Sequence, residues 1–230
     1  MIGLPNGYYM TTGSVSTFAK SMALFFREGV LRFHDTGALC ATSRWAAKAL
    51  TNKLRETRGP RHILELGPGT GSVTVQILAD MIPGDKLTIC EINPRFMENL
   101  KNRLYSNQAY QARSSDVSFF QGAAQELPEP ETPFDIIVCA LPFTNFSIST
   151  VRDIFERLHR VSHDETVMTY YEYIGLRKVS QLLSTPEKRS RLIEIDGFFN
   201  QKHRHDLIKQ ERIWLNFLPI EVHTLRVGSE

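Results

Sequence analysis

The sequence has few cysteines, no long apolar run and almost no net charge, and each absence excludes a class of protein. Three cysteines in 230 residues, without metal-ligand spacing, do not suit a disulfide framework or a metal centre. No stretch approaches the roughly 18 to 20 apolar residues of a membrane-spanning helix, and the start lacks the basic and apolar blocks of a secretion signal. With no repeat and an ordinary globular composition, the chain is expected to form one large folded unit in the cytoplasm.

The small net charge of +2 hides an uneven distribution along the chain. Residues 1–62 carry nine Lys or Arg against three Asp or Glu, which is a net charge of +6. Residues 63–176 carry eight against fifteen, which is a net charge of −7. A basic front end joined to an acidic middle predicts that the front end meets an anionic partner.

An amphipathic helix is expected over residues 14–33, because large apolar residues recur there at helical spacing. Lys20 and Arg27 project away from the apolar stripe. Two interpretations of the stripe stay open: it packs on the rest of the protein as a lid, or it lies in the interface of an anionic bilayer. The residues of the stripe fall within roughly 140° of one another: Val15, Phe18, Met22, Phe25, Phe26, Val30 and Phe33.

From residue 61 onward, short apolar runs alternate with amphipathic stretches. This alternation predicts right-handed crossovers and an α/β, doubly wound, mostly parallel sheet with helices on both faces. The expected strands are 62–66, 86–92, 117–122, 134–141 and 165–173, and the expected helices are 44–54, 70–81, 94–105 and 147–161.

The last part of the chain predicts a different arrangement. The run ERIWLNFLPIEVHTLRV is divided by Pro219, which indicates an antiparallel hairpin on the sheet edge. The basic stretch 177–212 before it is expected to hold a helix and a long loop. We therefore divide the chain into an N-terminal helical segment, 1–58, and a main domain, 59–230.

The strongest chemical signal is the passage ILELGPGTG, which ends an expected strand and opens an expected helix. Gly67, Gly69 and Gly71 allow tight turning and a close approach of the backbone to a ligand. Glu65 lies at the carboxyl end of the strand, where it can accept a hydrogen bond from a ligand amino group. Glu91 ends the next strand, 20 residues beyond Gly71, where such folds place an acidic residue on the two ribose hydroxyls.

A carboxylate beside this loop argues against a dinucleotide. The loop reads G-P-G-T-G, and Glu65 would repel a pyrophosphate while suiting the cationic methionyl end of S-adenosylmethionine. The pattern E-L-G-x-G-T-G, with an acidic residue ending the next strand, resembles the class I S-adenosylmethionine-dependent methyltransferases over roughly residues 60–175. The resemblance implies a seven-stranded Rossmann-like sheet and S-adenosylmethionine as the cofactor.

The resemblance also implies further positions around the cofactor. Ile92 follows the ribose-binding Glu91. The family often has Gly-Asp-Ala, with its Asp on the adenine, where this chain has Gly122, Ala123 and Ala124, so adenine recognition would rest on backbone groups or on Gln125. The positions expected beside the transferable methyl group are Ala140, Leu141 and Pro142.

A narrower resemblance lies outside this core. FFREGVLRFHDTGALCATS, residues 25–43, is similar to the segment F-x(n)-P-x3-G-A-x-x-P-S-S of bacterial phospholipid N-methyltransferases, with Gly37, Ala38 and Ser43 as the matching positions. LPFTNF and NFLPIEVHTLRV are similar to other segments of that family. The first proline and the Pro-Ser pair of the pattern are absent here. Ser43 is accordingly expected at the cofactor, and the helix 14–33 is expected to contact an anionic membrane.

The expected reaction is methyl transfer to the amine of a lipid head group, with phosphatidylethanolamine favoured and an ornithine lipid next. Such an in-line displacement needs positioning, exclusion of water and one proton acceptor. Tyr171 and Tyr173, at the end of the fifth strand, and Tyr9 are the candidate catalytic residues, and each has half-buried packing as its other interpretation. Aromatic faces would also hold a methylated ammonium group.

The rival interpretations belong to other classes. An rRNA adenine dimethylase-like enzyme shares this core but carries N-P-P-Y or N-L-P-Y where this chain reads A-L-P-F, so it lacks the Asn that grips the target amine. A non-catalytic binding module would require lost cofactor contacts. His203 and His205 lack partners at metal spacing and are expected in a solvated loop, so no metal is predicted. We expect a monomer at the inner face of the membrane that binds no nucleic acid.

Overall fold

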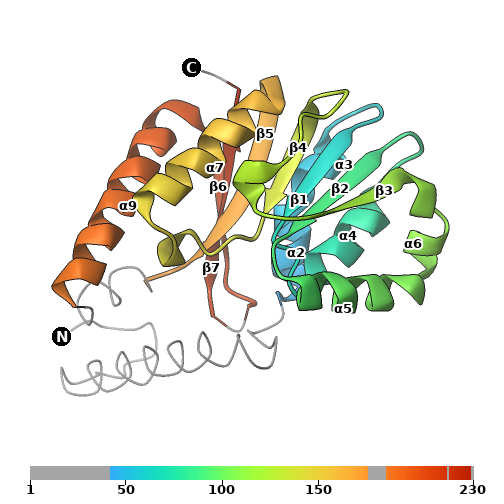
Figure 1. Cartoon of the computed structure of the whole chain (residues 1–230), viewed down its shortest axis with the longest axis horizontal. Coiled ribbons are helices and arrows are strands. Elements are labelled where there is room, and N and C mark those ends of the chain that lie inside the picture. Colours follow the sequence, from blue (N-terminus) through green and yellow to red (C-terminus); the bar gives the residue numbers. More distant parts are fainter. Residues whose placement is uncertain (1–41, 176–184, 217, 229–230) are drawn as a thin grey trace, which may run out of the picture.

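The computed structural model describes residues 42–175, 185–216 and 218–228. These residues form a seven-stranded sheet in the order β3-β2-β1-β4-β5-β7-β6 (Figure 1). The five neighbouring strands β3, β2, β1, β4 and β5 pair in parallel. The strand β7 pairs antiparallel with both β5 and β6. The prediction of a doubly wound, mostly parallel sheet that ends in an antiparallel hairpin is therefore confirmed.

The elements alternate along the chain as strands and covering helices. The strands are β1 (His62–Leu66), β2 (Lys86–Glu91), β3 (Val117–Gln121), β4 (Phe134–Cys139), β5 (Ser162–Tyr173), β6 (Leu207–Ile213) and β7 (Ile220–Arg226). The α-helices are α2 (Arg44–Leu50), α3 (Asn52–Glu56), α4 (Ser72–Asp80), α5 (Pro94–Tyr105), α6 (Gln108–Gln111), α7 (Ile148–Arg160) and α9 (Pro186–Asp206). Three short 3₁₀ turns are η1 (Ser114–Asp116), η2 (Ala124–Glu126) and η3 (Phe143–Asn145).

Local chemistry explains why α5 begins where it does. The Asn93 side chain accepts hydrogen bonds from the backbone N–H groups of Arg95 and Phe96, and Pro94 fills the first helical position, where its missing N–H costs nothing. Its apolar residues Met97, Leu100 and Leu104 face inward at helical spacing. The strand β2 and the helix α5 thus meet at one short turn, which places Glu91 beside the helix start.

Two apolar cores cover the two faces of the sheet. One packs α2, α3, α4, α5 and α6 on the sheet and includes Leu50, Ile77 and Leu104. The other packs α7 and α9 on the opposite face and includes Phe155 and Phe199. The described part of the segment 1–58 therefore shares a core with the sheet, because α2 and α3 pack against it.

Two helical expectations differ from the structure. The expected single helix 44–54 is interrupted at Thr51, whose side chain donates a hydrogen bond to Oδ2 of Asp80 at 2.7 Å. The expected long loop before the hairpin is wrong, because α9 runs through Gly197 and β6 follows it directly. A Cβ at Gly197 would have no atom of a described residue within 4 Å, so this glycine leaves the packing of the helix undisturbed.

Within the described ranges, no helix is both long enough and apolar enough to cross a bilayer. The predicted amphipathic helix 14–33 lies outside the described residues, as does Tyr9.

Candidate functional site

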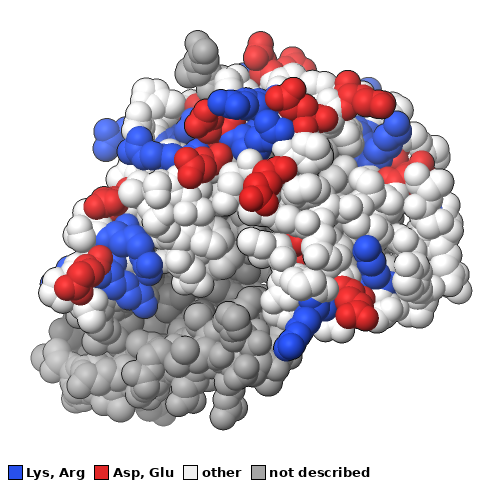
Figure 2. Space-filling view, in the orientation of Figure 1, with Lys and Arg blue, Asp and Glu red and all other residues white. Residues whose placement is uncertain are grey.

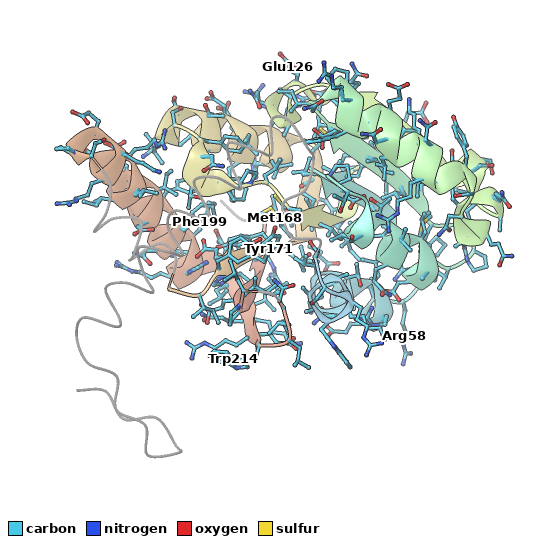
Figure 3. The ribbon with its side chains drawn as sticks, turned by 90° about the horizontal axis from the view of Figure 1, so that it is seen from below. Arg58, Glu126, Met168, Tyr171, Phe199 and Trp214 are labelled. Atoms are coloured by element: carbon cyan, nitrogen blue, oxygen red, sulfur yellow. The ribbon has the colours of Figure 1, made fainter. Side chains whose placement is uncertain are left out.

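The carboxyl ends of the parallel strands are joined to one another by backbone hydrogen bonds. Gly67 N–H donates to the Cys90 carbonyl at 2.9 Å, and Ala140 N–H donates to the Leu66 carbonyl at 2.9 Å. The strand order reverses between the parallel neighbours β1 and β4: the chain continues from β1 to β2 on one side and from β4 to β5 on the other. In open α/β sheets, ligands bind in the crevice at this point. The candidate site is therefore this edge, which Figure 3 views from below.

The three glycines of the first loop have two different tasks. All three adopt positive φ angles, of 68°, 53° and 78° for Gly67, Gly69 and Gly71. A Cβ at Gly67 would lie 2.9 Å from Cδ2 of Leu141, and one at Gly71 would collide with Cδ1 of Leu100. At Gly69, no atom of a described residue lies within 4 Å of the same position. Gly67 and Gly71 therefore permit internal packing, while Gly69 exposes its backbone to open space that a ligand can fill.

Glu65 is a buried acid that no described residue pairs with a positive charge. Its side chain has no exposed surface, and neither carboxylate oxygen makes a hydrogen bond with good geometry to a described residue. Burial raises the pKa of Glu65 to about 8, and the nearby Thr74 hydroxyl and Glu91 modulate this value in opposite directions. An unpaired acid in such a place is costly unless a ligand completes it. An incoming ammonium group fits this position, because it favours the ionised carboxylate.

Glu91 is held in place by backbone amides. Its Oε1 accepts from Asn93 N–H at 2.8 Å, and the N–H groups of Gly69 and Ile92 also interact with the carboxylate. Burial is the largest influence on Glu91 and raises its pKa. Ile92 beside it is a large apolar side chain that is 67% exposed. A carboxylate with an apolar neighbour matches the chemistry of a ribose with its attached base.

The loop after β3, which contains Gly122, Ala123 and Ala124, lacks the carboxylate that the resembling family often has there. Gly122 N–H donates to the Glu91 carbonyl at 3.2 Å, so this loop joins the same edge. The side chain of Glu126 folds back to accept from Ala123 N–H at 3.3 Å. Ala123 and Ala124 are buried, and Gln125 is exposed. The polar groups that remain here for an adenine are backbone atoms and the Gln125 amide.

Two tyrosines lie beside the end of β4. The register pairs Cys139 with Tyr170. Tyr171 is therefore level with Ala140, the residue that precedes Leu141 and Pro142 in the chain. The rings of Tyr171 and Tyr173 meet edge to face at 5.6 Å between centroids. Burial raises the pKa of Tyr171, so its hydroxyl stays protonated at neutral pH. Tyr171 can orient a substrate by hydrogen bonding, but it does not supply a phenolate base.

Ser43 lies at the start of α2, close to the hairpin. Its hydroxyl accepts from Ala46 N–H at 3.2 Å, which caps the helix. Its own N–H donates to Oδ1 of Asn216, in the loop between β6 and β7, at 3.0 Å. These bonds give Ser43 a structural role, and its expected place at the cofactor stays a prediction.

Sequence reasoning missed Thr74 and Asn216. Thr74 lies in the first turn of α4, is fully buried, and its hydroxyl lowers the pKa of Glu65. A buried threonine inside a helical apolar stripe was the available signal. Asn216, which joins the hairpin to α2, offered none, because its partner is 173 residues away in the sequence.

The histidine His203 has a different environment from the expected loop. It lies on α9, its Nε2 is 2.6 Å from the Tyr170 hydroxyl, and its ring stacks on His223 at 4.6 Å. The expectation of a solvated loop was wrong because α9 continues beyond Gly197. Across the described ranges, no three His, Cys, Asp or Glu residues cluster as a metal site would require.

The central part of the chain matches a known family model. Residues 63–165 match the family model described as a methyltransferase domain. This range begins within β1, contains β2, β3 and β4, and so includes Glu65, Glu91 and Ala140.

Two curated relatives differ in how much of the chain they match. Demethylmenaquinone methyltransferase of Thermus thermophilus is 28% identical over 107 residues, which are 46% of this chain and 44% of that protein. The match thus spans less than half of that relative's length. Ornithine lipid N-methyltransferase of Singulisphaera acidiphila is 25% identical over 145 residues, which are 63% of this chain and 71% of that protein.

A solved structure matches the fold over nearly the whole chain. The O-methyltransferase TomG from Streptomyces achromogenes, in complex with S-adenosylmethionine, has a TM-score of 0.61 at 18% identity. The match covers 91% of this chain and 90% of that structure. At this identity the likeness concerns the fold.

Proposed function

We propose that this chain, which contains a class I S-adenosylmethionine-dependent methyltransferase domain, methylates the amine of a membrane lipid head group. Phosphatidylethanolamine is the favoured acceptor, and an ornithine lipid is the next. The amphipathic segment 14–33 belongs to this proposal as a contact with the anionic membrane surface.

The extent of one alignment carries the proposal. The match to the ornithine lipid N-methyltransferase covers 63% of this chain, whereas the match to the menaquinone enzyme covers 46%. The methyltransferase domain spans residues 63–165, which are 103 residues. An alignment of 145 residues must therefore extend beyond that core. Segments outside the core determine the acceptor, because the core serves many acceptors.

On the cofactor side, the residues have separate roles. S-adenosylmethionine, when bound, supplies a methyl group on a sulfonium centre. Glu65 would hold the amino group of its methionyl end, and Glu91 would accept from the ribose hydroxyls. Gly69 leaves room for the ligand at the loop. Gly67 and Gly71 keep the loop packed on Leu141 and Leu100.

On the acceptor side, Tyr171 and Tyr173 would form the wall beside Ala140. The Tyr171 hydroxyl would accept a hydrogen bond from the amine N–H and so orient the nitrogen lone pair. The cofactor would supply the methyl group to an amine nitrogen held there, and the methylated amine would release one proton to water. Aromatic rings at this position would also stabilise a methylated ammonium by cation–π contact.

The nucleic-acid alternative fits the chain less well. Ala140 occupies the place where adenine dimethylases carry an Asn on the target amine. On the face shown in Figure 2, Lys and Arg are interspersed with Asp and Glu over the described residues. A nucleic-acid-binding surface gathers Lys and Arg into a stripe or patch.

The direct test uses the purified full chain with radiolabelled S-adenosylmethionine. One reaction receives total bacterial lipid and the other receives total RNA. The proposal expects label in an aminolipid, whose identity then separates phosphatidylethanolamine from an ornithine lipid. Label in RNA alone, or in neither fraction, would overturn it.

A second experiment tests the place of Tyr171. Tyr171→Phe removes the hydroxyl and keeps the ring, so kcat should fall roughly tenfold while the affinity for the cofactor is unchanged. Tyr105→Phe, at the exposed end of α5, is the control. Equal kcat values for the wild type and Tyr171→Phe would remove this residue from the acceptor site.

A further inference from the structure

Four large apolar side chains on segments near the carboxyl edge are exposed. Trp214 and Leu215, in the loop between β6 and β7, are 63% and 66% exposed. Trp45 in the first turn of α2 and Ile174 after β5 are also exposed. We call these four residues the apolar rim. Figure 3 shows Trp214 at the margin of the molecule, with Tyr171 further inside.

Hydrogen bonds hold the segments of the apolar rim together. Asn216 accepts from Ser43 N–H at 3.0 Å, and its Nδ2 donates to the Leu218 carbonyl at 2.9 Å. Ile174 N–H donates to the Pro219 carbonyl at 2.9 Å. The start of α2, the end of β5 and the hairpin loop are thereby fixed to one another. The rim is a built surface, because three chain segments present it in a defined arrangement.

Positive charge accompanies the apolar rim. The Arg44 guanidinium lies over the Trp45 ring, 4.9 Å from its centroid, and Lys48 is exposed one turn further along α2. Neither cation forms an ion pair with another described residue. Arg212, just before Trp214, is partly neutralised by Glu221 at 2.7 Å. Bulky apolar groups beside cations with no acidic partner among these residues complement an anionic surface with an apolar interior.

We infer that the apolar rim docks onto the surface of an anionic bilayer and so brings the acceptor side of the site to the lipid head groups. The inference rests on the proposed lipid substrate. Tryptophan favours the level of the head groups, where its ring is partly apolar and its N–H stays hydrated. The rim lies on the same edge as Tyr171 and Ala140. Docking therefore places the membrane where an amine head group would enter.

The sequence supplies a direct reporter of this contact. The chain has two tryptophans, Trp45 and Trp214, and both belong to the rim. Their fluorescence should shift to shorter wavelength when the full chain meets vesicles of phosphatidylglycerol and phosphatidylcholine. Trp45→Phe leaves Trp214 as the single reporter, and its shift should persist. Absence of a shift in both proteins would overturn the inference.

A sedimentation experiment tests the side chains themselves. Trp214→Ser with Leu215→Ser should reduce the partition coefficient onto these vesicles roughly tenfold or more, because two bulky apolar groups are lost. The matched control is Ile82→Ser with Ile208→Ser, two exposed apolar residues near the opposite edge. The control should partition as the wild type does. Equal losses in both double variants, or none in the rim variant, would overturn the inference.

This outcome is separable from the proposed function. The vesicles contain no primary amine, so docking is measured without any methyl acceptor. Methyl transfer is measured separately, with phosphatidylethanolamine dispersed in detergent micelles. A protein that docks but methylates no aminolipid loses the proposed function and keeps the docking surface. A protein that methylates micellar lipid but ignores the vesicles loses the docking surface alone.

Discussion

Each end of the parallel strands carries a fully buried acid, and the two acids have opposite environments. We call the end formed by the amino termini of the strands the amino edge and the other end the carboxyl edge. At the amino edge, Asp85 is fully buried and accepts from the backbone N–H of Arg61 at 2.8 Å, from its Nε at 3.0 Å and from its Nη2. Ile82 N–H donates to the same carboxylate at 2.8 Å. At the carboxyl edge, Glu65 is equally buried, and no described residue gives it such a partner.

The difference distinguishes a structural acid from one kept for a ligand. Burying a carboxylate costs several kcal/mol unless hydrogen bonds and an opposite charge offset the loss of water. The fold provides both for Asp85. Glu65, in contrast, has a pKa raised to about 8. Its burial is unfavourable in free energy, and binding of a cation beside it can offset this.

The largest expected effect is the loss of cofactor binding in Gly69→Arg. A long side chain would fill the open space at this loop, and the positive φ of 53° adds only local strain. Calorimetric titration should detect no S-adenosylmethionine binding, while thermal unfolding stays cooperative. Gly197→Arg, in the open interior of α9, is the control and should bind normally. Binding by Gly69→Arg equal to that of the wild type would remove the loop from the site.

At the amino edge, Asp85→Ala should lower the stability of the fold, whereas Gly69→Arg lowers cofactor binding. This change leaves the buried Arg61 without its counter-ion, so the free energy of unfolding should fall by roughly 3 to 5 kcal/mol in urea titrations. Glu156→Ala breaks an exposed ion pair with Arg160 and should cost about 0.5 kcal/mol or less. Equal effects of the two changes would erase the contrast between a buried and an exposed acid.

Glu65→Gln should change how the free energy of unfolding depends on pH. The unfolded chain releases the Glu65 proton near pH 4.5, whereas the folded chain holds it to about pH 8. The native state binds more protons in this window, so the wild type loses stability as pH rises through it, by up to roughly 1.4 kcal/mol per unit. Glu65→Gln should not show this loss. Parallel stability curves for the two proteins would contradict the raised pKa.

The smallest effect is expected for Glu91→Ala. Loss of hydrogen bonds from a charged acceptor to two hydroxyls should weaken cofactor binding by roughly 1 to 3 kcal/mol. Glu98→Ala, on the exposed surface of α5, removes the same charge without touching the site. A calorimetric comparison in which both variants bind as the wild type does would remove Glu91 from the site.

Local signals predicted the parallel half of the fold well. The strand 62–66 and the helix 94–105 have the predicted bounds, because Pro94 and the apolar period mark them clearly. The helix α9 was cut short because Gly197 reads as a break. In three dimensions its position faces open space, where a missing side chain costs little beyond backbone entropy.

The candidate site was predictable in position but not in energetics. The order of Glu65, the glycines and Glu91 along the chain follows from strand and turn patterns. That no described residue pairs with Glu65 follows only from the three-dimensional packing. The exposure of Trp214 and Leu215 was missed for a similar reason, since the sequence reads as part of an apolar strand and the turn is set by pairing between β6 and β7.

The most direct measurement is the number of protons released when S-adenosylmethionine binds. Titration calorimetry at about pH 6.5, in buffers of different ionisation enthalpy, gives this number. If Glu65 receives the amino group, the wild type should release about one proton per cofactor, because the ammonium favours the ionised carboxylate. Glu65→Gln should bind more weakly and release none. Binding without proton release by the wild type, or equal release by both proteins, would contradict the assignment of Glu65 to the cofactor.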